Sequence, residues 1–335
     1  MTKRITAADF AAEILAHDDI LILIHSHPDG DTAGTGVALL NALSACGKNA
    51  AVACTDELAD HLSFISDYAD SKNCFFGASF EDAFTPSYIV SVDIASTFLV
   101  GKSLSEYADN ISLALDHHDT NTLECPKLFV EETSSSAGET LYFVILEMEK
   151  LSGKKLIDKN TACAIYSAIA SDSGNFKFSN VSGRTMMTAG KLIDAGAENA
   201  EISRRLFDIR SFGTYIAEAL CTKNTQFFCD GKIAFSHITY AEMEEKGIIG
   251  DELDTCVQLL RTIKGVETAV FAKEKTGEDG QIKFRLSMRS NEYVDVAAIC
   301  AAFDGGGHKK AAGCTVFGEI ADVTEKIVKV ISEKL

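Results

Sequence analysis

Short apolar runs recur along the first half of the chain, and stretches with helical spacing separate them. Each run is too short for a helix and predicts a strand that is buried on both faces. The predicted strands are 20–24, 50–54, 88–92, 111–115 and 128–130, and the predicted helices are 32–46, 137–151 and 161–170. Strands that alternate with helices form βαβ units, so residues 1–190 are expected to build an α/β domain around a largely parallel sheet.

From residue 185 the pattern becomes mainly helical, and then strands return. Helical spacing covers 185–194, 199–207 and 215–222. The later elements are predicted strands at 232–236, 268–273 and 281–288, and helices at 251–264, 295–303 and 321–335. These patterns predict a helical connector at 191–224 and a second, smaller α/β domain at 225–335.

Histidine and aspartate gather where the predicted strands of the first domain end. The residues at these ends are His25, Asp29, Asp31, Asp93, Asp116, His117 and His118, together with Asp172 at the end of a predicted helix. The carboxyl ends of parallel strands meet at one edge of a sheet, so these side chains are expected to converge. A single Asp in such a loop is often a helix cap or a turn residue. Four such loops together favour a metal centre.

The mixture of imidazole and carboxylate also indicates which metal would bind. Ligation by His and Asp without thiolate favours Mn²⁺ or a similar divalent ion over structural zinc. Several carboxylates in one pocket repel one another unless a cation is bound. Two cations that share an Asp can generate hydroxide at neutral pH. The helix expected from Thr32 would also direct free N–H groups towards an anion.

Composition limits the partners and the compartment. The 335 residues carry a net charge of −18, and no basic stripe of the kind that tracks long nucleic acid is present. If the substrate is a phosphate ester, a short one held by a few local cations is therefore expected instead of a long strand or duplex. None of the ten cysteines has Cys-x-x-Cys spacing, which favours free thiols in a reducing compartment. No apolar run reaches the roughly 18–20 residues of a membrane span. We expect a cytoplasmic protein that does not bind membranes.

Four segments resemble, in order, the motifs of the DHH phosphoesterases. They are HSHPDGD at 25–31, SVD at 91–93, LDHHDTN at 115–121 and SDSGNF at 171–176. The segment GGGHKKAAG at 305–313 is similar to the glycine-rich signature of the DHH-associated C-terminal domain. The two-domain size most resembles the nanoRNase/pAp-phosphatase branch of bifunctional oligoribonucleases. Such proteins cleave very short RNAs and remove the 3′-phosphate from 3′-phosphoadenosine 5′-phosphate (pAp).

The resemblance implies a role for each residue of the expected centre. One Mn²⁺ would be held by His25, Asp29 and Asp93. A second would be held by Asp31, Asp93, His117 and Asp172, with Asp93 bridging the two ions. Asp116 would orient His117, and His118 would contact the substrate phosphate or orient the attacking water, so the expected catalytic residues are Asp93, Asp116 and His118. His27 stands where many relatives have Asn, and every implied ligand is intact.

For the second domain, the resemblance implies a grip on the terminal phosphate or ribose of the substrate. The implied substrate-binding residues are Arg289, Ser290, Gly306, Gly307 and His308. Arginine suits phosphate because its planar fork donates two hydrogen bonds at once. A glycine triplet alone is often only a flexible turn. The neighbouring Lys309 and Lys310, with Arg285 and Arg289 on a predicted strand expected nearby, add local positive charge.

The expected function is therefore the degradation of RNAs of about two to five nucleotides to mononucleotides, and the dephosphorylation of pAp to AMP. A binding site for one end of the substrate and a reaction centre for the other would together select substrates by length. One alternative is a phosphodiesterase for linear dinucleotides such as pApA that arise from cyclic dinucleotide breakdown. Another, from a different class, is a nucleotide-binding sensor without activity. The sequence leaves a homodimer open, since symmetric dimers are the commonest assemblies.

Overall fold

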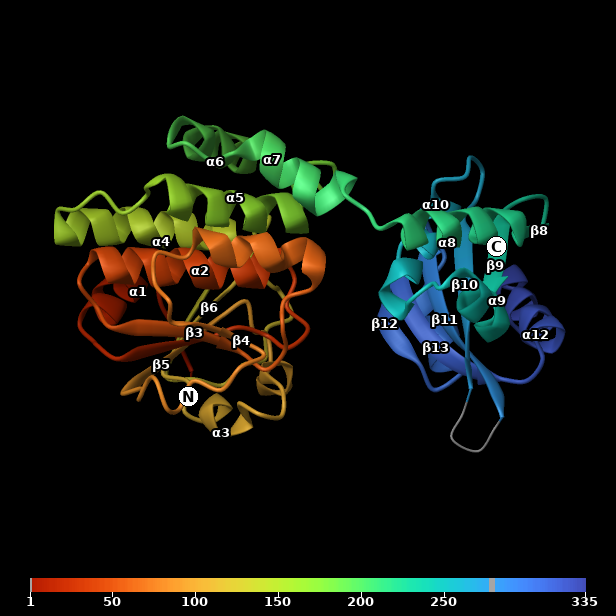
Figure 1. The fold of residues 1–335 in the computed structure, drawn as a ribbon, viewed down its shortest axis with the longest axis horizontal. Coiled ribbons are helices and arrows are strands. Elements are labelled where there is room, and N and C mark those ends of the chain that lie inside the picture. The colour runs from red at the N-terminus through yellow and green to blue at the C-terminus, as the bar shows by residue number, and fades with distance from the viewer. Residues whose placement is uncertain (1, 277–280) are drawn as a thin grey trace. The chain divides into compact units, whose positions relative to one another are not determined.

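The structure, a computed structural model, describes residues 2–276 and 281–335 and divides the chain into two compact units. The first unit is Met1–Ile209 and the second is Arg210–Leu335 (Figure 1). Each unit has its own sheet, of seven strands in the first and six in the second. The α/β fold, with a parallel sheet first and a smaller α/β region after it, is confirmed.

The sheet of the first unit is parallel throughout and has the order β1-β7-β6-β5-β2-β3-β4. Its strands are β1 (Lys3–Arg4), β2 (Ile20–Leu23), β3 (Ala50–Cys54), β4 (Cys74–Phe76), β5 (Tyr88–Val92), β6 (Leu113–Asp116) and β7 (Lys127–Val130). The short edge strands β1 and β4, of two and three residues, were not predicted because they carry too little pattern. Strands β6, β5 and β2 are neighbours, so the segments that follow them leave the sheet at the same edge.

Both faces of this sheet are covered, which explains the continuous apolar runs in the sequence. Ile20 and Ile22 face a core shared with the helices, whereas Leu21 and Leu23 belong to a separate core on the other face. The helices on the first face are α1 (Ala7–Leu15), α2 (Gly30–Ala45), α4 (Ala137–Ser152) and α5 (Lys159–Asp172) (Figure 1). The opposite face is closed by segments that include the turn η2 (Thr97–Val100) and α3 (Ser105–Ala108).

Helices α2 and α5 pack closely because glycines lie at their contact. A Cβ added to Gly34 would lie 2.4 Å from the carbonyl oxygen of Ala164, and one added to Gly30 would lie 2.6 Å from the side chain of Ser171. The start of α2, with Asp29 and Asp31, is therefore held next to the end of α5.

The segment 191–224, predicted to be one connector, is divided between the two units. Helices α6 (Gly183–Asp194) and α7 (Asn199–Ser203), with the turn η3 (Arg204–Asp208), belong to the first unit, and α8 (Phe212–Lys223) belongs to the second. The reason is burial: Leu192 and Ile202 join the core of the first unit, whereas Ala217 and Cys221 join a core of the second.

The sheet of the second unit has the order β12-β13-β11-β10-β9-β8, in which only the pair β9–β10 is parallel. Its strands are β8 (Gln226–Phe228), β9 (Ile233–Ile238), β10 (Thr268–Thr276), β11 (Ile282–Ser290), β12 (Gly306–His308) and β13 (Ala311–Phe317). The surrounding helices are α9 (Tyr240–Lys246), the turn η4 (Gly250–Leu253), α10 (Cys256–Arg261), α11 (Val296–Ala301) and α12 (Ile320–Ser332). The helix expected at 251–264 is thus broken at Asp254 and Thr255.

Within residues 2–276 and 281–335, no helix combines the length and the apolar character that a membrane span requires.

Candidate metal centre

The predicted ligands meet at the carboxyl edge of the first sheet. Strand β2 leads to His25, β5 is followed directly by Asp93, and β6 ends at Asp116. The close contact of α2 and α5 adds the carboxylates from the start of one helix and the end of the other. Three groups of side chains have ligand atoms within 4.8 Å of one another: His25–Asp29–Asp93, Asp31–His117–Asp172 and Asp93–Asp116–His117–His118.

The first group is formed by His25, Asp29 and Asp93. His25 Nε2 lies 3.8 Å from Asp29 Oδ1 and 3.6 Å from Asp93 Oδ2. The other ring nitrogen, Nδ1, lies 2.8 Å from the carbonyl oxygen of Ser26. A carbonyl only accepts, so Nδ1 carries a proton, and Nε2 is the ring nitrogen that faces the two carboxylates.

The second group contains Asp31, His117 and Asp172, and it shares Asp93 with the first. His117 Nε2 lies 3.6 Å from Asp31 Oδ2, 3.7 Å from Asp172 Oδ2 and 3.8 Å from Asp93 Oδ1. The two oxygens of Asp93 are therefore directed at different histidines, one at His25 and the other at His117. This is the arrangement that a bridging carboxylate requires.

The chemistry of Asp93 tests whether a metal fits this place. The side chain is 3% exposed, and its Oδ1 has no hydrogen-bond partner among the described residues. A buried carboxylate oxygen without a partner is costly unless a cation binds it. The separations of 3.6–3.8 Å are too long for hydrogen bonds. They suit two ligands that each lie roughly 2.0–2.2 Å from one ion. The residues therefore fit divalent cations.

The pKa values record how strongly negative charge is concentrated here. Burial raises the pKa of Asp31 well above its ordinary value, and the charges of Asp93 and Asp172 raise it further. Burial also raises the pKa of Asp172, to about 6. Burial lowers the pKa of His25, but the neighbouring carboxylates outweigh this effect and raise it to about 9. Carboxylates gathered this closely repel one another, and a divalent cation removes that repulsion.

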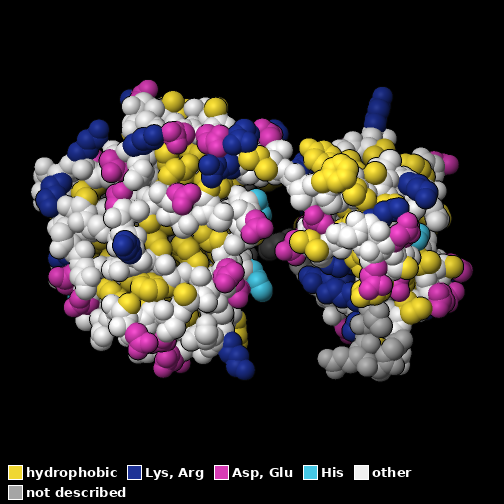
Figure 2. Space-filling view, in the orientation of Figure 1, with side chains coloured by type: hydrophobic (Ala, Val, Ile, Leu, Met, Phe, Trp, Pro, Cys, Tyr) yellow, Lys and Arg dark blue, Asp and Glu magenta, His cyan; other side chains and the backbone are white. Residues whose placement is uncertain are grey.

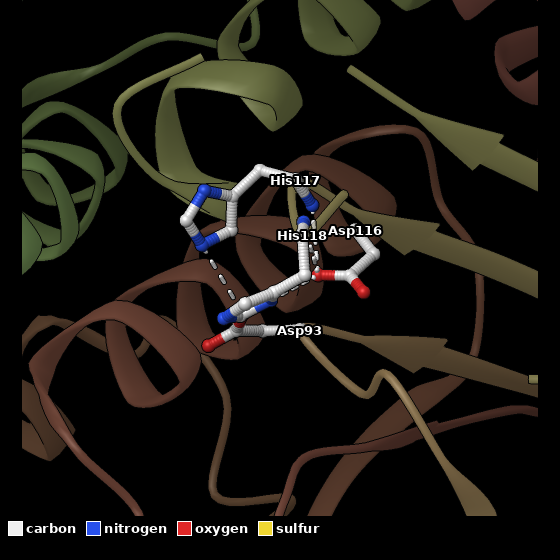
Figure 3. A group of neighbouring side chains, drawn as sticks. All are labelled: Asp93, Asp116, His117 and His118. Carbon is white, nitrogen blue, oxygen red and sulfur yellow. Dashed lines mark hydrogen bonds and ion pairs between the residues drawn. The ribbon is translucent and has the colours of Figure 1, made fainter. Parts of the chain in front are cut away.

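Asp116 acts on a different histidine from the one predicted (Figure 3). Its Oδ1 accepts hydrogen bonds from His118 Nδ1 at 2.8 Å and from the backbone N–H of His117 at 2.7 Å, while Asn121 donates to Oδ2. Asp116 thus fixes the ring of His118 and only the backbone of His117. Residues two apart in an extended segment lie on the same side, which explains why the ring of His118 meets the carboxylate.

The same contact sets the charge of His118. Its hydrogen bond with Asp116 raises the pKa of His118 to about 9, against the opposing effect of burial. The side chain is 47% exposed, and with Nδ1 bound to Asp116 only Nε2 is available to a substrate. His118 is therefore placed to donate a hydrogen bond from a protonated ring at the rim of the centre.

Two features of the ligand loops were not predicted from the sequence. The N–H groups of Ala137 and Gly138, at the start of α4, donate to Asp31 Oδ2 at 2.7 Å and to Asp31 Oδ1 at 2.9 Å. Asp93 has a left-handed backbone with φ of 58°, a strained conformation that is concentrated at functional sites. The serines before Ala137 could have indicated a helix start, but nothing local to them indicates a contact with Asp31.

Asp29 is both a helix cap and a member of a candidate ligand group. It is the N-cap of α2, and its Oδ1 accepts from the backbone N–H groups of Asp31 and Thr32 at 2.9 and 3.0 Å. The same carboxylate also lies in the first ligand group. The helix cap therefore orients a candidate ligand.

In the second unit the predicted substrate-binding residues do not all lie together. Arg285, Ser287 and Arg289 alternate along β11 and share one face of the sheet. Ser290 lies on the opposite face and is 1% exposed, because the two-residue period of the strand turns it away from Arg289. The hydroxyl of Ser290 is therefore not available to a ligand on the arginine face.

The glycine-rich segment forms the edge strand β12. Gly306 pairs with Gly313, and Gly307 adopts a φ of 141°, at which a Cβ would lie 2.5 Å from the carbonyl oxygen of Ala311. Close backbone pairing thus requires glycine at position 307, whereas a Cβ added to Gly306 would meet nothing within 4 Å. His308 contributes its backbone to β12, and its side chain lies outside the described part of the structure.

Two protein-family models match the chain. The model described as "DHH family, N-terminal domain" matches residues 19–169, and the model described as "DHHA1 domain" matches residues 231–335. The chain therefore contains a DHH-family N-terminal domain and a DHHA1 domain. The family expected from the four motifs and the glycine-rich segment is therefore confirmed.

The chain is also similar to characterised proteins over nearly its whole length. It is 28% identical over 330 residues to the "Bifunctional oligoribonuclease and PAP phosphatase NrnA" of Thermus thermophilus, with 97% of this chain and 93% of the relative covered. To the protein of the same name from Bacillus subtilis it is 26% identical over 305 residues, with 91% of each covered. An "exopolyphosphatase-related protein from Bacteroides Fragilis" shares the fold, with a TM-score of 0.83 at 21% identity, covering 98% of this chain and 95% of that one.

The two domain matches agree with the division of the chain into two units. The first match lies within Met1–Ile209 and the second within Arg210–Leu335. Asp172 lies three residues beyond the first match, but the end of α5 still brings it to the ligand group of Asp31 and His117. Its place in the centre therefore follows from the packing of α5.

Proposed function

We propose that this protein is a metal-dependent phosphoesterase that degrades RNAs of about two to five nucleotides and dephosphorylates pAp to AMP. The single observation that supports this most is Asp93, a buried carboxylate whose two oxygens are directed at two separate His/Asp groups. The full-length relatives named as oligoribonuclease and PAP phosphatase supply the substrate class.

In this proposal two divalent ions, Mn²⁺ in the first instance, occupy the two ligand groups. His25, Asp29 and Asp93 hold one ion, and the other is held by Asp31, Asp93, His117 and Asp172. When bound, such ions neutralise the charge of the phosphate and activate water. The chain itself holds the carboxylates in place, and the hydrogen bond from Nδ1 of His25 to Ser26 leaves Nε2 as the ring nitrogen that an ion would bind.

His118 and Asp116 act on the phosphate without binding an ion. His118 donates from Nε2 to a phosphate oxygen, and its hydrogen bond with Asp116, which raises its pKa to about 9 in the metal-free protein, favours the protonated ring. Asp116 keeps the ring in that orientation through Nδ1. A fixed donor of this kind stabilises the charge that develops in the transition state and needs no reorganisation during the reaction.

The second unit supplies the grip on the substrate end. Arg289 and Arg285 lie on one face of β11, and arginine binds a terminal phosphate with two parallel hydrogen bonds. The net charge of −18 opposes long nucleic acids, which would be repelled outside this local basic face. We also propose a cytoplasmic location, because all ten cysteines are free, and a homodimer, which light scattering would test.

The test is the hydrolysis of a 5′-labelled RNA series, from dinucleotides to long oligomers, with pAp and pApA measured in parallel. We expect Mn²⁺-dependent rates that are highest for the shortest RNAs, turnover of pAp, and loss of every activity in Asp93→Ala. The exposed Asp109→Ala serves as the matched control and should behave like the wild type.

Three outcomes would contradict parts of the proposal. Equal or faster cleavage of long RNAs would overturn the length preference. Hydrolysis of pApA without turnover of other short RNAs or of pAp would favour the specialised phosphodiesterase. Nucleotide binding without any hydrolysis would favour the sensor.

A further inference from the structure

Glu139 is a fully buried carboxylate outside the ligand groups. Its Oε2 accepts from the backbone N–H of Ser135 at 2.8 Å, from Ser135 Oγ at 2.7 Å and from Thr185 Oγ1 at 3.0 Å. Its Oε1 accepts from Arg184 Nε at 3.0 Å. A buried charge is tolerated only when it is paired and hydrogen-bonded. The four donors meet this condition, and they tie the turn before α4 to the start of α6.

This network fixes the part of α4 that contacts a candidate ligand. Ser136 caps the helix by accepting from the backbone N–H of Glu139 at 3.0 Å. The next two N–H groups, of Ala137 and Gly138, donate to both oxygens of Asp31. Any shift of the turn would therefore move the donors that orient the Asp31 carboxylate.

Arg184 braces the turn from α6. Besides its bond to Glu139, the guanidinium donates to Ser134 Oγ at 2.9 Å and lies over the ring of Phe143, with 5.2 Å from Cζ to the ring centroid. Its side chain is 33% exposed, so its removal would leave an opening to solvent instead of a closed cavity. Truncation of Arg184 leaves no closed cavity, but it deprives the buried Glu139 of its cation and should lower the free energy of unfolding. Truncation of Glu139 itself would leave a cavity and several unpaired donors, so it is the less clean test.

Asn180 joins the same turn to the second helix that carries a ligand. Its Nδ2 donates to the carbonyl oxygen of Ser135 at 2.9 Å and to the carbonyl oxygen of Asp172 at 3.1 Å. One side-chain amide thus links the turn before α4 with the end of α5. Asn180 is exposed, so it contributes little to the core.

We propose that Arg184 and Asn180 are positioning residues for the ion position formed by Asp31, His117 and Asp172. They hold two carboxylate-bearing segments at the separation that this ion requires, and they set its affinity relative to that of the other ion. Among the described residues, Arg184 and Asn180 make no hydrogen bond to His25 or Asp29. The ion position formed by His25, Asp29 and Asp93 therefore serves as an internal reference. The inference rests on the metal centre of the proposed function.

The experiment is a calorimetric titration of the metal-free, full-length protein with Mn²⁺. For the wild type we expect two ions. In Arg184→Ala and Asn180→Ala one ion should keep its affinity and the other should bind about 10- to 100-fold more weakly, the usual effect of losing a group that orients a ligand. Lys191→Met, which removes an exposed cation from the same helix α6, is the matched control and should leave both affinities unchanged.

Two further measurements separate positioning from general damage to the fold. The electron paramagnetic resonance of the wild type at two equivalents of Mn²⁺ should show coupling between the ions, and this coupling should be lost at the same loading in both variants. Added guanidinium should restore the weakened affinity in Arg184→Ala but not in Asn180→Ala. Thermal unfolding in the presence of EDTA should be nearly the same for the wild type, Asn180→Ala and Lys191→Met. Arg184→Ala should unfold at a lower temperature, because it leaves Glu139 buried without its cation, so Asn180→Ala is the variant that separates positioning from stability.

Each outcome has one meaning. Wild-type affinity for both ions in Arg184→Ala and Asn180→Ala would overturn the inference, and so would an equal loss at both positions. A wild type that binds two ions but cleaves no short RNA would refute the proposed substrate and leave the inference standing. A wild type that binds no divalent ion would refute the proposed function itself.

Discussion

The two sheets of the protein carry their charged residues in different ways. In the first unit, buried carboxylates and imidazoles sit in the loops at the ends of parallel strands. In the second unit, Lys283, Arg285 and Arg289 lie along one face of the antiparallel strand β11. Figure 2 shows the histidines of the first unit gathered in one region and a patch of lysine and arginine on the second. Side chains from several loops can surround a single point, an arrangement that can bind an ion. Side chains on one face of a strand lie in a row, an arrangement that can bind phosphate groups.

This difference predicts how each site responds to substitution. The candidate ligands of the first unit lie close enough for their charges to act on one another, and Asp93 lies between the two ion positions. The loss of one ligand should therefore weaken ion binding at the whole centre. The arginines of the second site are partly exposed and separate, so each loss should be graded. The predictions below test this contrast, beginning with the largest effect.

Asp93→Asn should lower kcat by about three orders of magnitude or more, because several kcal/mol of charge stabilisation by the ions is lost. The amide has the volume of the carboxylate, so the fold should persist. Steady-state kinetics on a short RNA measures the effect, with Asp109→Asn as the control. A loss below tenfold would show that Asp93 is not shared between two ions.

Addition of Mn²⁺ should raise the thermal stability of the first unit and leave the second unchanged. At a concentration of about 100 times the dissociation constant, one bound ion adds about 2.7 kcal/mol to the free energy of unfolding. That corresponds to a rise of about 5–11 °C in the unfolding midpoint of a domain of this size. Calorimetry with and without EDTA measures the shift. An equal shift of the unfolding midpoint for both units, or no shift for the first, would contradict the assignment of the metal centre to the first unit alone.

Arg289→Met should raise KM for short RNA by about 10- to 100-fold and leave kcat nearly unchanged, because a charge-assisted hydrogen bond is worth about 1.5–3 kcal/mol. Arg285→Met should have a smaller effect of the same kind. Lys223→Met, on the exposed part of α8, removes an equal charge elsewhere on the second unit and serves as the control. A fall in kcat with no change in KM would place Arg289 in the reaction step.

His118 should titrate near pH 9 in the metal-free protein, and Asp116→Asn should return its pKa towards the ordinary value of about 6.5. The folded-state pKa lies above the unfolded value, so the pair stabilises the fold fully below about pH 6.5. This contribution is lost as the pH rises through about 9. NMR of the histidine rings measures the pKa, and urea unfolding in EDTA measures the stability. If His117 shifts in the variant and His118 does not, the pairing of Asp116 with His118 is wrong.

The sequence by itself determined the ligand types, the parallel sheet and the family. Each of these depends on local pattern: an apolar run specifies a buried strand, and the residues directly after it must lie at the edge of the sheet. The ligand loops that follow β2, β5 and β6 could therefore be predicted without knowing any long-range contact. The short strands β1 and β4, of two and three residues, could not.

Only the tertiary structure decided how the side chains are oriented. The bonds from Ala137 and Gly138 to Asp31 join residues more than a hundred positions apart, and Arg184 reaches Glu139 from another helix. The face that Ser290 occupies, in contrast, follows from the two-residue period of β11, which is a local pattern. Residue types and spacing restrict the positions that a side chain can occupy. Its hydrogen-bond partners are set by packing between segments that are distant in the chain, and these contacts have no local pattern.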